Sequence, residues 1–153
     1  MRGDPVTAPS LTLVRRIKAP PEKVFAAFTQ PQHILHWWGP DAGPTLHAEC
    51  DLRVGGRFRV VFETLDGTRY ENQGEYLEIE PAARLVMRWC WSATPHLRSR
   101  VTVVLRAIDI GTELVLVHDQ FVDEATRDQH RWGWNGTLEK LERWLMVGSD
   151  SLP

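Results

Sequence analysis

The chain has 153 residues, of which 42% are apolar and 25% charged, and its formal net charge at pH 7 is −2. A chain of this length fits one domain and buries roughly 70% of its unfolded surface without disulfide or metal staples. The near-neutral charge gives no electrostatic attraction to nucleic acid or to an anionic membrane, so neither is expected as a partner.

The cysteines and the N-terminal segment indicate a cytoplasmic protein. Cys50 and Cys90 occur in no CxxC or Cys/His spacing, which favours two reduced thiols over a metal site. The first 13 residues, MRGDPVTAPSLTL, lack the apolar core of a signal peptide. No apolar run reaches the ~20 residues that a membrane-spanning helix needs. We therefore expect no membrane anchor, no metal and no cofactor.

The first elements are a strand and two short helices. Residues 11–18 alternate loosely between apolar and polar side chains, as a strand does. A helix is predicted to begin near Pro21, because proline is tolerated in the first turn, and to end before Pro31. A second short helix is predicted over 32–38, where Gly39–Pro40 would stop it.

Strands separated by turns are predicted from Thr45 to about Asp119. Gly55–Gly56 and Asp66–Gly67 mark hairpin turns, and the alternating segments between such turns give six strands. With the first strand, the predicted sheet has about seven.

The last predicted element is a long helix from about Asp123, a suitable N-cap, to about Met146. Its apolar stripe, at spacings of four, three and four, consists of Trp134, Leu138, Leu141 and Leu145. Strands joined by hairpins and followed by one amphipathic helix predict an α+β fold, in which a curled antiparallel sheet wraps the helix. We expect one domain over 1–153, with its core at about 11–146. A cavity is predicted at the end where the two short helices sit.

Four stretches together resemble a known family. They are APPEKVFAAFTQPQHILHWWGP, DLRVGGRFR, DGTRYENQGEYLEIEPAARLVMRW, and GTELVLVHDQF followed by HRWGWNGTLEKLERWL. The chain is similar to homologues of the activator of the heat-shock protein 90 ATPase, within the SRPBCC superfamily of START-like domains. This resemblance implies a helix-grip fold like that of the birch pollen allergens, a bacterial origin and a link to the stress response. Since the superfamily includes ligand carriers, enzymes and a co-chaperone, the fold alone does not choose among these functions.

Two tryptophan pairs are candidates for the lining of the cavity. Trp37 and Trp38 would point about 100° apart on a helix end, so that one can face the cavity while the other packs in the core. Trp89 and Trp91, two apart on a strand, share one face. For both pairs, plain core packing is the alternative.

Trp132 cannot join the apolar stripe of the last helix, because it lies about 200° from Trp134 around the axis. Either it faces solvent at the mouth of a cavity or at a partner, or the helix bends before Gly133. Gly133 and Gly136 each weaken the helix by about 1 kcal/mol relative to alanine, which suggests a close backbone approach there.

Polar candidates are fewer. His47, Tyr70 and His118 lie on strands that could reach the cavity, although a buried histidine bonded to backbone is the simpler interpretation of His118. His33 and His36, three apart on a helix, could touch one metal, but the sequence shows no third ligand. Four arginines are predicted to form a basic stripe on the convex face of the sheet, where they could dock an acidic partner or simply be solvated: Arg88, Arg98, Arg100 and Arg106.

Three functions fit these observations. The first is non-enzymatic binding of a small hydrophobic or aromatic ligand between the sheet and the last helix. The second is a co-chaperone-like interaction module. The third is a cyclase- or dehydratase-like enzyme in which His47, Tyr70 or His118 acts as general acid or base, although the sequence assembles no catalytic group. The predicted ligand-binding residues are Trp37, Trp38, His47, Phe58, Tyr70, Trp89, Trp91, His118, Phe121, Trp132 and Trp134.

Overall fold

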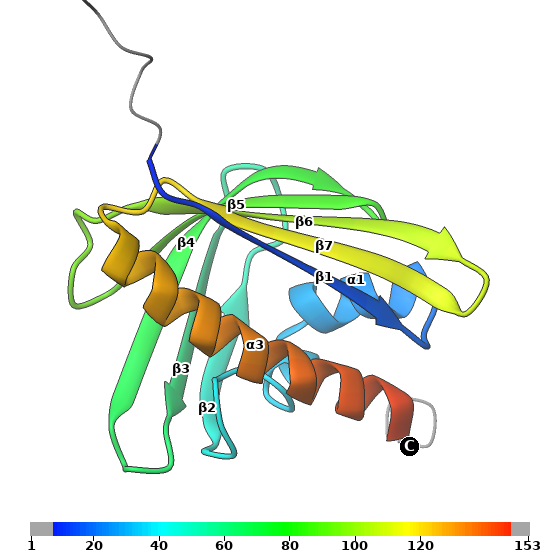
Figure 1. The fold of residues 1–153 in the computed structure, drawn as a ribbon, viewed down its shortest axis with the longest axis horizontal. Helices are drawn as coiled ribbons and strands as arrows, with labels where there is room; N and C mark the ends of the chain where they lie inside the picture. Colours follow the sequence, from blue (N-terminus) through cyan, green and yellow to red (C-terminus); the bar gives the residue numbers. More distant parts are fainter. Residues whose placement is uncertain (1–7, 148–153) are drawn as a thin grey trace, which may run out of the picture.

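The structure, a computed structural model, describes residues 8–147. Residues 1–7, on which part of the expectation of no signal peptide depends, lie outside the described residues. Seven strands and three helices follow one another as shown in Figure 1. Their bounds are β1 Leu11–Ile17, α1 Pro21–Thr29, α2 Pro31–Ile34, β2 Thr45–Cys50, β3 Arg57–Glu63, β4 Arg69–Glu80, β5 Arg84–Trp91, β6 Ser99–Ile108, β7 Gly111–Asp119 and α3 Glu124–Val147.

The strands form one antiparallel sheet in the order β1-β7-β6-β5-β4-β3-β2. Strands β2 to β6 each pair with the next strand along the chain, and β1 pairs with β7. The pairing register shifts between Thr45 and His47 and between Tyr76 and Glu78, and irregularities of this kind bend a sheet. The predicted seven-stranded curled sheet is confirmed.

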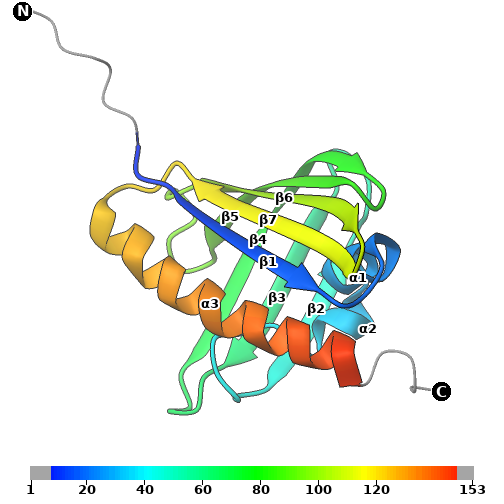
Figure 2. The same ribbon diagram turned by 45° about the vertical axis from the view of Figure 1, so that its right-hand side comes forward.

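Helix α3 lies across the concave face of the sheet (Figure 2). Asp123 caps it, since Oδ1 of Asp123 accepts the backbone N–H of Thr126 at 2.8 Å. The four residues of the predicted apolar stripe are each at most 5% exposed, which confirms the stripe that the spacing predicted: Trp134, Leu138, Leu141 and Leu145.

The two short helices fill one end of the molecule. Helix α2 is shorter than predicted, because the chain leaves the helix after Ile34 and continues as a turn. The ring of Phe28 packs edge-on against Trp37 at 4.8 Å, and both side chains are buried. His33 and His36 contact Trp144, near the C-terminal end of α3. The cavity is expected at this end, but the pocket of the structure is lined by no residue of α1 or α2.

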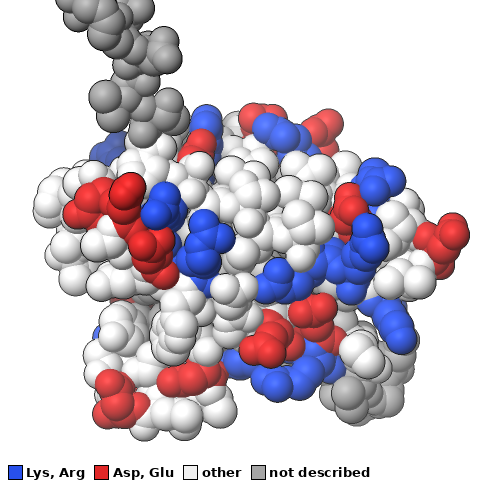
Figure 3. All heavy atoms as spheres, in the orientation of Figure 1, with Lys and Arg blue, Asp and Glu red and all other residues white. Residues whose placement is uncertain are grey.

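The surface has no dominant charge on the face that carries α3, where acidic and basic side chains are intermixed (Figure 3). Within residues 8–147, no helix is both long enough and apolar enough to cross a membrane.

Candidate functional site

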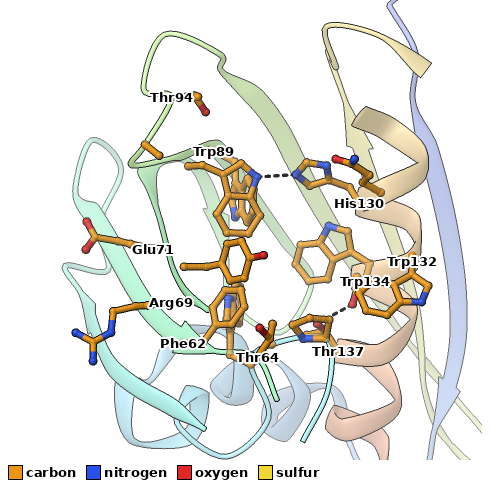
Figure 4. A pocket seen from close by; sticks show the side chains of 18 of the residues that line it. Phe62, Thr64, Arg69, Glu71, Trp89, Thr94, His130, Trp132, Trp134 and Thr137 are labelled. Carbon is orange, nitrogen blue, oxygen red and sulfur yellow. Dashed lines mark hydrogen bonds between the residues drawn. The ribbon is translucent and has the colours of Figure 1, made fainter. Parts of the chain in front are cut away.

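A pocket of about 1000 Å³ lies between the N-terminal half of α3 and strands β3, β4 and β5, and the segment after α2 closes one side of it. None of its lining residues belongs to α1 or α2. Figure 4 shows the sheet and the helix as two walls that face each other across the pocket. The aromatic side chains that line the pocket are Trp38, Phe62, Tyr70, Trp89, Trp91, His130, Trp132 and Trp134.

The sheet wall is a continuous set of rings on three neighbouring strands. Phe62 of β3 and Tyr70 of β4 are cross-strand partners, and their rings stack at 5.4 Å. Trp91 of β5 lies 5.8 Å from Tyr70 and meets Trp89 at 4.8 Å with nearly perpendicular planes. Because alternate residues of a strand share a face, Trp89 and Trp91 turn to the same side, as the sequence predicts.

The helix wall consists of residues three and four apart on α3. His130, Trp134 and Thr137 share one side of the helix, with Gly133 between them. Trp132 lines the rim and is 66% exposed. Of the two predicted alternatives, the first agrees with the structure: Trp132 faces solvent at the pocket mouth, on an α3 that runs uninterrupted from Glu124 to Val147.

His118 holds the inner end of this wall through side chains. The indole N–H of Trp134 donates to Nδ1 of His118 at 2.9 Å, so that Nδ1 carries no proton and Nε2 does. Nε2 then donates to the Ser99 hydroxyl at 2.7 Å. Burial, and then the neighbouring His130, hold the pKa of His118 well below its usual value. The expectation of a bond to backbone is wrong: both nitrogens are occupied by side chains.

His130 forms a second such link in the pocket wall itself. Its Nδ1 donates to the backbone carbonyl of Thr126 at 2.7 Å, and its Nε2 accepts the indole N–H of Trp91 at 2.9 Å. Burial lowers the pKa of His130, partly opposed by the bond to Thr126. The rings of His118 and His130 lie 5.1 Å apart. Two neutral histidines of fixed tautomer thus orient one tryptophan of each wall.

The segment that closes the pocket is fixed to both layers. Nε1 of Trp38 donates to the side-chain oxygen of Asn72 at 3.0 Å. Nζ of Lys140 donates to the carbonyls of Trp38 at 3.1 Å and of Asp41 at 2.7 Å. Burial lowers the pKa of Lys140, partly opposed by the negative charge of Asp41.

The charged side chains that line the pocket form their ion pairs with residues outside it. Arg69 and Glu71 point away from the space between the two walls (Figure 4). A hydrogen bond from Ser92, and then one from Arg59, lower the pKa of Glu71. Each of the three charged lining residues has an ion-pair partner: Glu63 for Arg69 at 3.3 Å, Arg59 for Glu71 at 2.9 Å and Arg127 for Asp128 at 3.0 Å. The space between the walls is accordingly bounded by uncharged, mainly aromatic surface.

Of the predicted ligand-binding residues, six line the pocket: Trp38, Tyr70, Trp89, Trp91, Trp132 and Trp134. The other five are not among its lining residues: Trp37, His47, Phe58, His118 and Phe121. Trp37 is fully buried and donates its N–H to the carbonyl of Ala27 at 3.0 Å. Phe58 packs against Tyr76, and Phe121 against His118.

The three proposed acid–base groups do not converge. His47 is exposed and bonded to Glu49 at 2.7 Å, while His118 is buried behind the pocket wall with both nitrogens occupied. Only Tyr70 borders the pocket.

Two aromatic residues of the lining, Phe62 and His130, are not among those predicted from the sequence. His130 lies one turn before Trp134 on the same side of α3, so extending the apolar stripe backwards by four residues would have found it. Phe62 shares its strand face with Phe58, but no pattern in the sequence shows which of the two reaches the pocket.

The structure does not support a metal site at His33 and His36, and part of the predicted basic stripe is neutralised. The rings of His33 and His36 pack on Trp144, and among residues 8–147 no cluster of three or more His, Cys, Asp or Glu could hold a metal. In the predicted basic stripe, Arg100 forms a two-bond pair with Asp119, and Arg106 pairs with Glu113 at 2.9 Å. Acidic neighbours therefore neutralise two of its four arginines.

An antiparallel sheet of this strand order curls around a long C-terminal helix, and two short helices follow β1. This arrangement defines a helix-grip domain. The family model of the activator of Hsp90 ATPase homolog 1-like proteins matches residues 18–146, and the chain belongs to this family. A comparison with curated proteins found no match.

Solved structures share this fold. Protein CV1439 from Chromobacterium violaceum is 26% identical with a TM-score of 0.80, over 90% of this chain and 97% of that one. The AHSA1 protein SPO3351 from Silicibacter pomeroyi is also 26% identical with a TM-score of 0.80, over 91% and 99%. Protein MLL2253 from Mesorhizobium loti is 28% identical with a TM-score of 0.74, over 92% and 99%.

Proposed function

We propose that this protein binds a small, flat, uncharged aromatic molecule in the pocket between α3 and strands β3–β5. The observation that carries the proposal is the pair of facing aromatic walls, with Phe62, Tyr70 and Trp91 on one side and Trp134 and Trp132 on the other. Pockets of several hundred Å³ with mainly apolar walls are the usual sites of small-molecule binding. Two walls lined by aromatic rings favour a planar ligand, because each face of such a ligand can stack on a ring or contact a ring edge.

The state of the polar groups favours an uncharged ligand. His130 is neutral and its two ring nitrogens are occupied, and the carboxylate of Glu71 is already bonded to Arg59 and Ser92. A charged ligand would lose its hydration without gaining a partner between the walls. The phenolic oxygen of Tyr70, which makes no hydrogen bond within the described part of the chain, offers one polar contact at the mouth.

A matched pair of fluorescent probes tests this proposal. N-phenyl-1-naphthylamine is uncharged, and 8-anilino-1-naphthalenesulfonate has the same rings with an added sulfonate. We expect the uncharged probe to bind at least about tenfold more tightly, equivalent to about 1.4 kcal/mol. Equal affinity for the two, or no saturable binding of either, would contradict the proposal. Native mass spectrometry of protein purified from its host would then weigh the natural ligand.

Gly133 offers a variant that fills the pocket without disturbing the core. It lines the pocket, and a Cβ atom there would meet nothing within 4 Å, so Gly133→Leu projects a side chain between the walls. The matched control is Glu139→Leu, which adds leucine at an exposed position of the same helix outside the pocket. We expect Gly133→Leu to weaken binding of the uncharged probe at least about tenfold and Glu139→Leu to leave it unchanged.

The family description supports a second candidate, interaction with a chaperone of the heat-shock protein 90 class. Arg88 on β5 and Arg98 before β6 are exposed and have no ion pair to any residue from 8 to 147, so they could meet an acidic partner. The host chaperone should then bind this protein in a pull-down and lose that binding on Arg88→Glu but not on Gly133→Leu. Retention of binding by the arginine variant would exclude this surface.

A further inference from the structure

We propose that His118 and His130 form a proton-operated latch, in which protonation of His130 releases Trp91 from the pocket wall and weakens ligand binding. The latch concerns the regulation of the proposed binding site, but its first step occurs in the ligand-free protein. It is carried by two indole-to-imidazole hydrogen bonds. The bond from Trp91 to His130 joins the sheet wall to the helix wall, and the bond from Trp134 to His118 joins the helix wall to β7 behind it.

Each of these bonds requires an unprotonated ring nitrogen. Indole nitrogen donates only, so the nitrogen that receives it must present a lone pair. His130 has no spare acceptor, since its other nitrogen already donates to the carbonyl of Thr126. A proton added to His130 must therefore go to Nε2, where it faces the N–H of Trp91 and replaces the hydrogen bond with two opposed donors.

The position of the two histidines determines which takes the proton first. His118 is 0% exposed and lies behind the wall, whereas His130 lines the pocket and can turn its charged ring toward water there. Once His130 is charged, a second charge on His118, with ring centroids 5.1 Å apart, is strongly opposed. The latch therefore opens with one proton, and the bond of Trp134 to His118 keeps the inner end of the wall in place.

The groups around His130 leave its own protonation as the step that controls the latch. Its ring contacts Trp89 and Trp91 of β5, His118 of β7 and Phe121 of the loop after β7, and it bonds to the backbone of Thr126 in α3. The charged side chains at the pocket rim are held in ion pairs by other residues: Arg69, Glu71 and Asp128. Among residues 8–147, no carboxylate hydrogen-bonds to either imidazole that would favour its charged form.

The first readout needs no ligand. In nitrogen-15-labelled protein, the indole signal of Trp91 should move with the same midpoint as the ring signals of His130 when the pH is lowered from about 8 to about 5, the range of histidine titration. The indole signal of Trp134 should stay in place until a lower pH. A Trp91 signal that does not change while His130 titrates would overturn the latch, as would cooperative unfolding before either group moves.

The second readout uses N-phenyl-1-naphthylamine, whose own charge does not change in this range. Below the midpoint of His130, its Kd should rise up to about tenfold per pH unit, as linkage to one proton requires. His130→Gln, whose side-chain oxygen can accept the Trp91 N–H at every pH, should abolish this dependence. The control His47→Gln, at an exposed histidine outside the pocket, should retain it.

The two readouts separate the two proposals. A coupled shift of Trp91 and His130 with no probe binding at any pH would uphold the release of Trp91 by protonation and reject the proposed ligand, and with it the effect of the latch on binding. Probe binding whose pH dependence persists in His130→Gln would uphold the ligand site and reject the latch.

Discussion

Gly136 of α3 lies directly against the backbone carbonyl of Pro40, so close that a Cβ atom at position 136 would overlap the carbonyl oxygen. The sequence indicates a close approach at Gly133 or Gly136, and the structure assigns it to Gly136, since a Cβ at Gly133 meets nothing within 4 Å. This contact lets the segment that closes the pocket rest on the helix.

The two glycines therefore give opposite results when replaced by alanine. Gly136→Ala should destabilise the protein by about 1–3 kcal/mol, because overpacking against rigid backbone outweighs the gain in helix propensity. Gly133→Ala should stabilise it by up to about 1 kcal/mol, since only the propensity changes. Urea unfolding of both variants checks this, and equal effects in the two would contradict the contact with Pro40.

Lys140 is the second attachment of the same segment. Lys140→Met should lower the free energy of unfolding by about 1–3 kcal/mol, because the carbonyl of Asp41 loses its charged hydrogen-bond donor. The carbonyl of Trp38 also loses Lys140 but still accepts a hydrogen bond from the hydroxyl of Thr45 at 2.8 Å. The substitution should also weaken probe binding, because the segment that carries Trp38 loses its hydrogen bonds to α3. Lys18→Met, at an exposed position, is the control and should alter neither stability nor binding. A Lys140→Met variant as stable as the wild type would show that the two hydrogen bonds contribute nothing.

Much of the fold follows from patterns within the chain. Alternating strands, the turn at Asp66–Gly67, and the cap at Asp123 with its apolar stripe are local signals, and the structure confirms each of them. The position of the pocket is not local. Whether Trp37 or Trp38 faces it depends on how the turn after Ile34 packs against α3, and such long-range packing leaves no periodicity in the sequence.

For the same reason, the hydrogen-bond partners of the two histidines could not be predicted from the sequence. His118 is visible in the sequence as a polar residue at the end of an apolar strand, but its partners come from Ser99 and Trp134, on two other elements. His130 is an ordinary polar residue of a helix until Trp91, 39 positions away, is placed beside it. The links between the two walls are tertiary features, and only the structure shows them.

Substitutions of Trp132 and of Trp37 should affect ligand binding and protein stability separately. Trp132 is 66% exposed at the pocket rim, so Trp132→Ala should leave the free energy of unfolding nearly unchanged and weaken binding of the uncharged probe several-fold. Trp37 is fully buried, so Trp37→Ala should cost about 3–5 kcal/mol through the cavity it creates. Thermal unfolding and probe titration of both variants measure the two effects. Unchanged probe affinity in Trp132→Ala would remove this residue from the site.

Stability should fall as the solution is acidified below neutral pH. The pKa values of His118 and His130 are lowered from the ordinary value of 6.5, so the unfolded chain takes up protons first as the pH falls. Their neutral forms stabilise the fold fully above about pH 6.5, and this contribution is lost as the pH falls toward each folded-state pKa. The slope can reach about 1.4 kcal/mol per pH unit for each histidine. Carboxylates with lowered pKa, such as Glu71, add to the loss only below 4.5.

Urea unfolding at a series of pH values between about 7.5 and about 5 measures this slope in the histidine range. The double variant His118→Gln, His130→Gln should flatten it, because each glutamine can accept its tryptophan N–H without titrating. A small residual slope should remain, since burial and the neighbouring His36 also lower the pKa of His33. His47→Gln should behave as the wild type. If the double variant kept the full slope, the acid sensitivity would come from other groups, and the two indole-to-imidazole bonds would not be the acid-sensitive part of the fold.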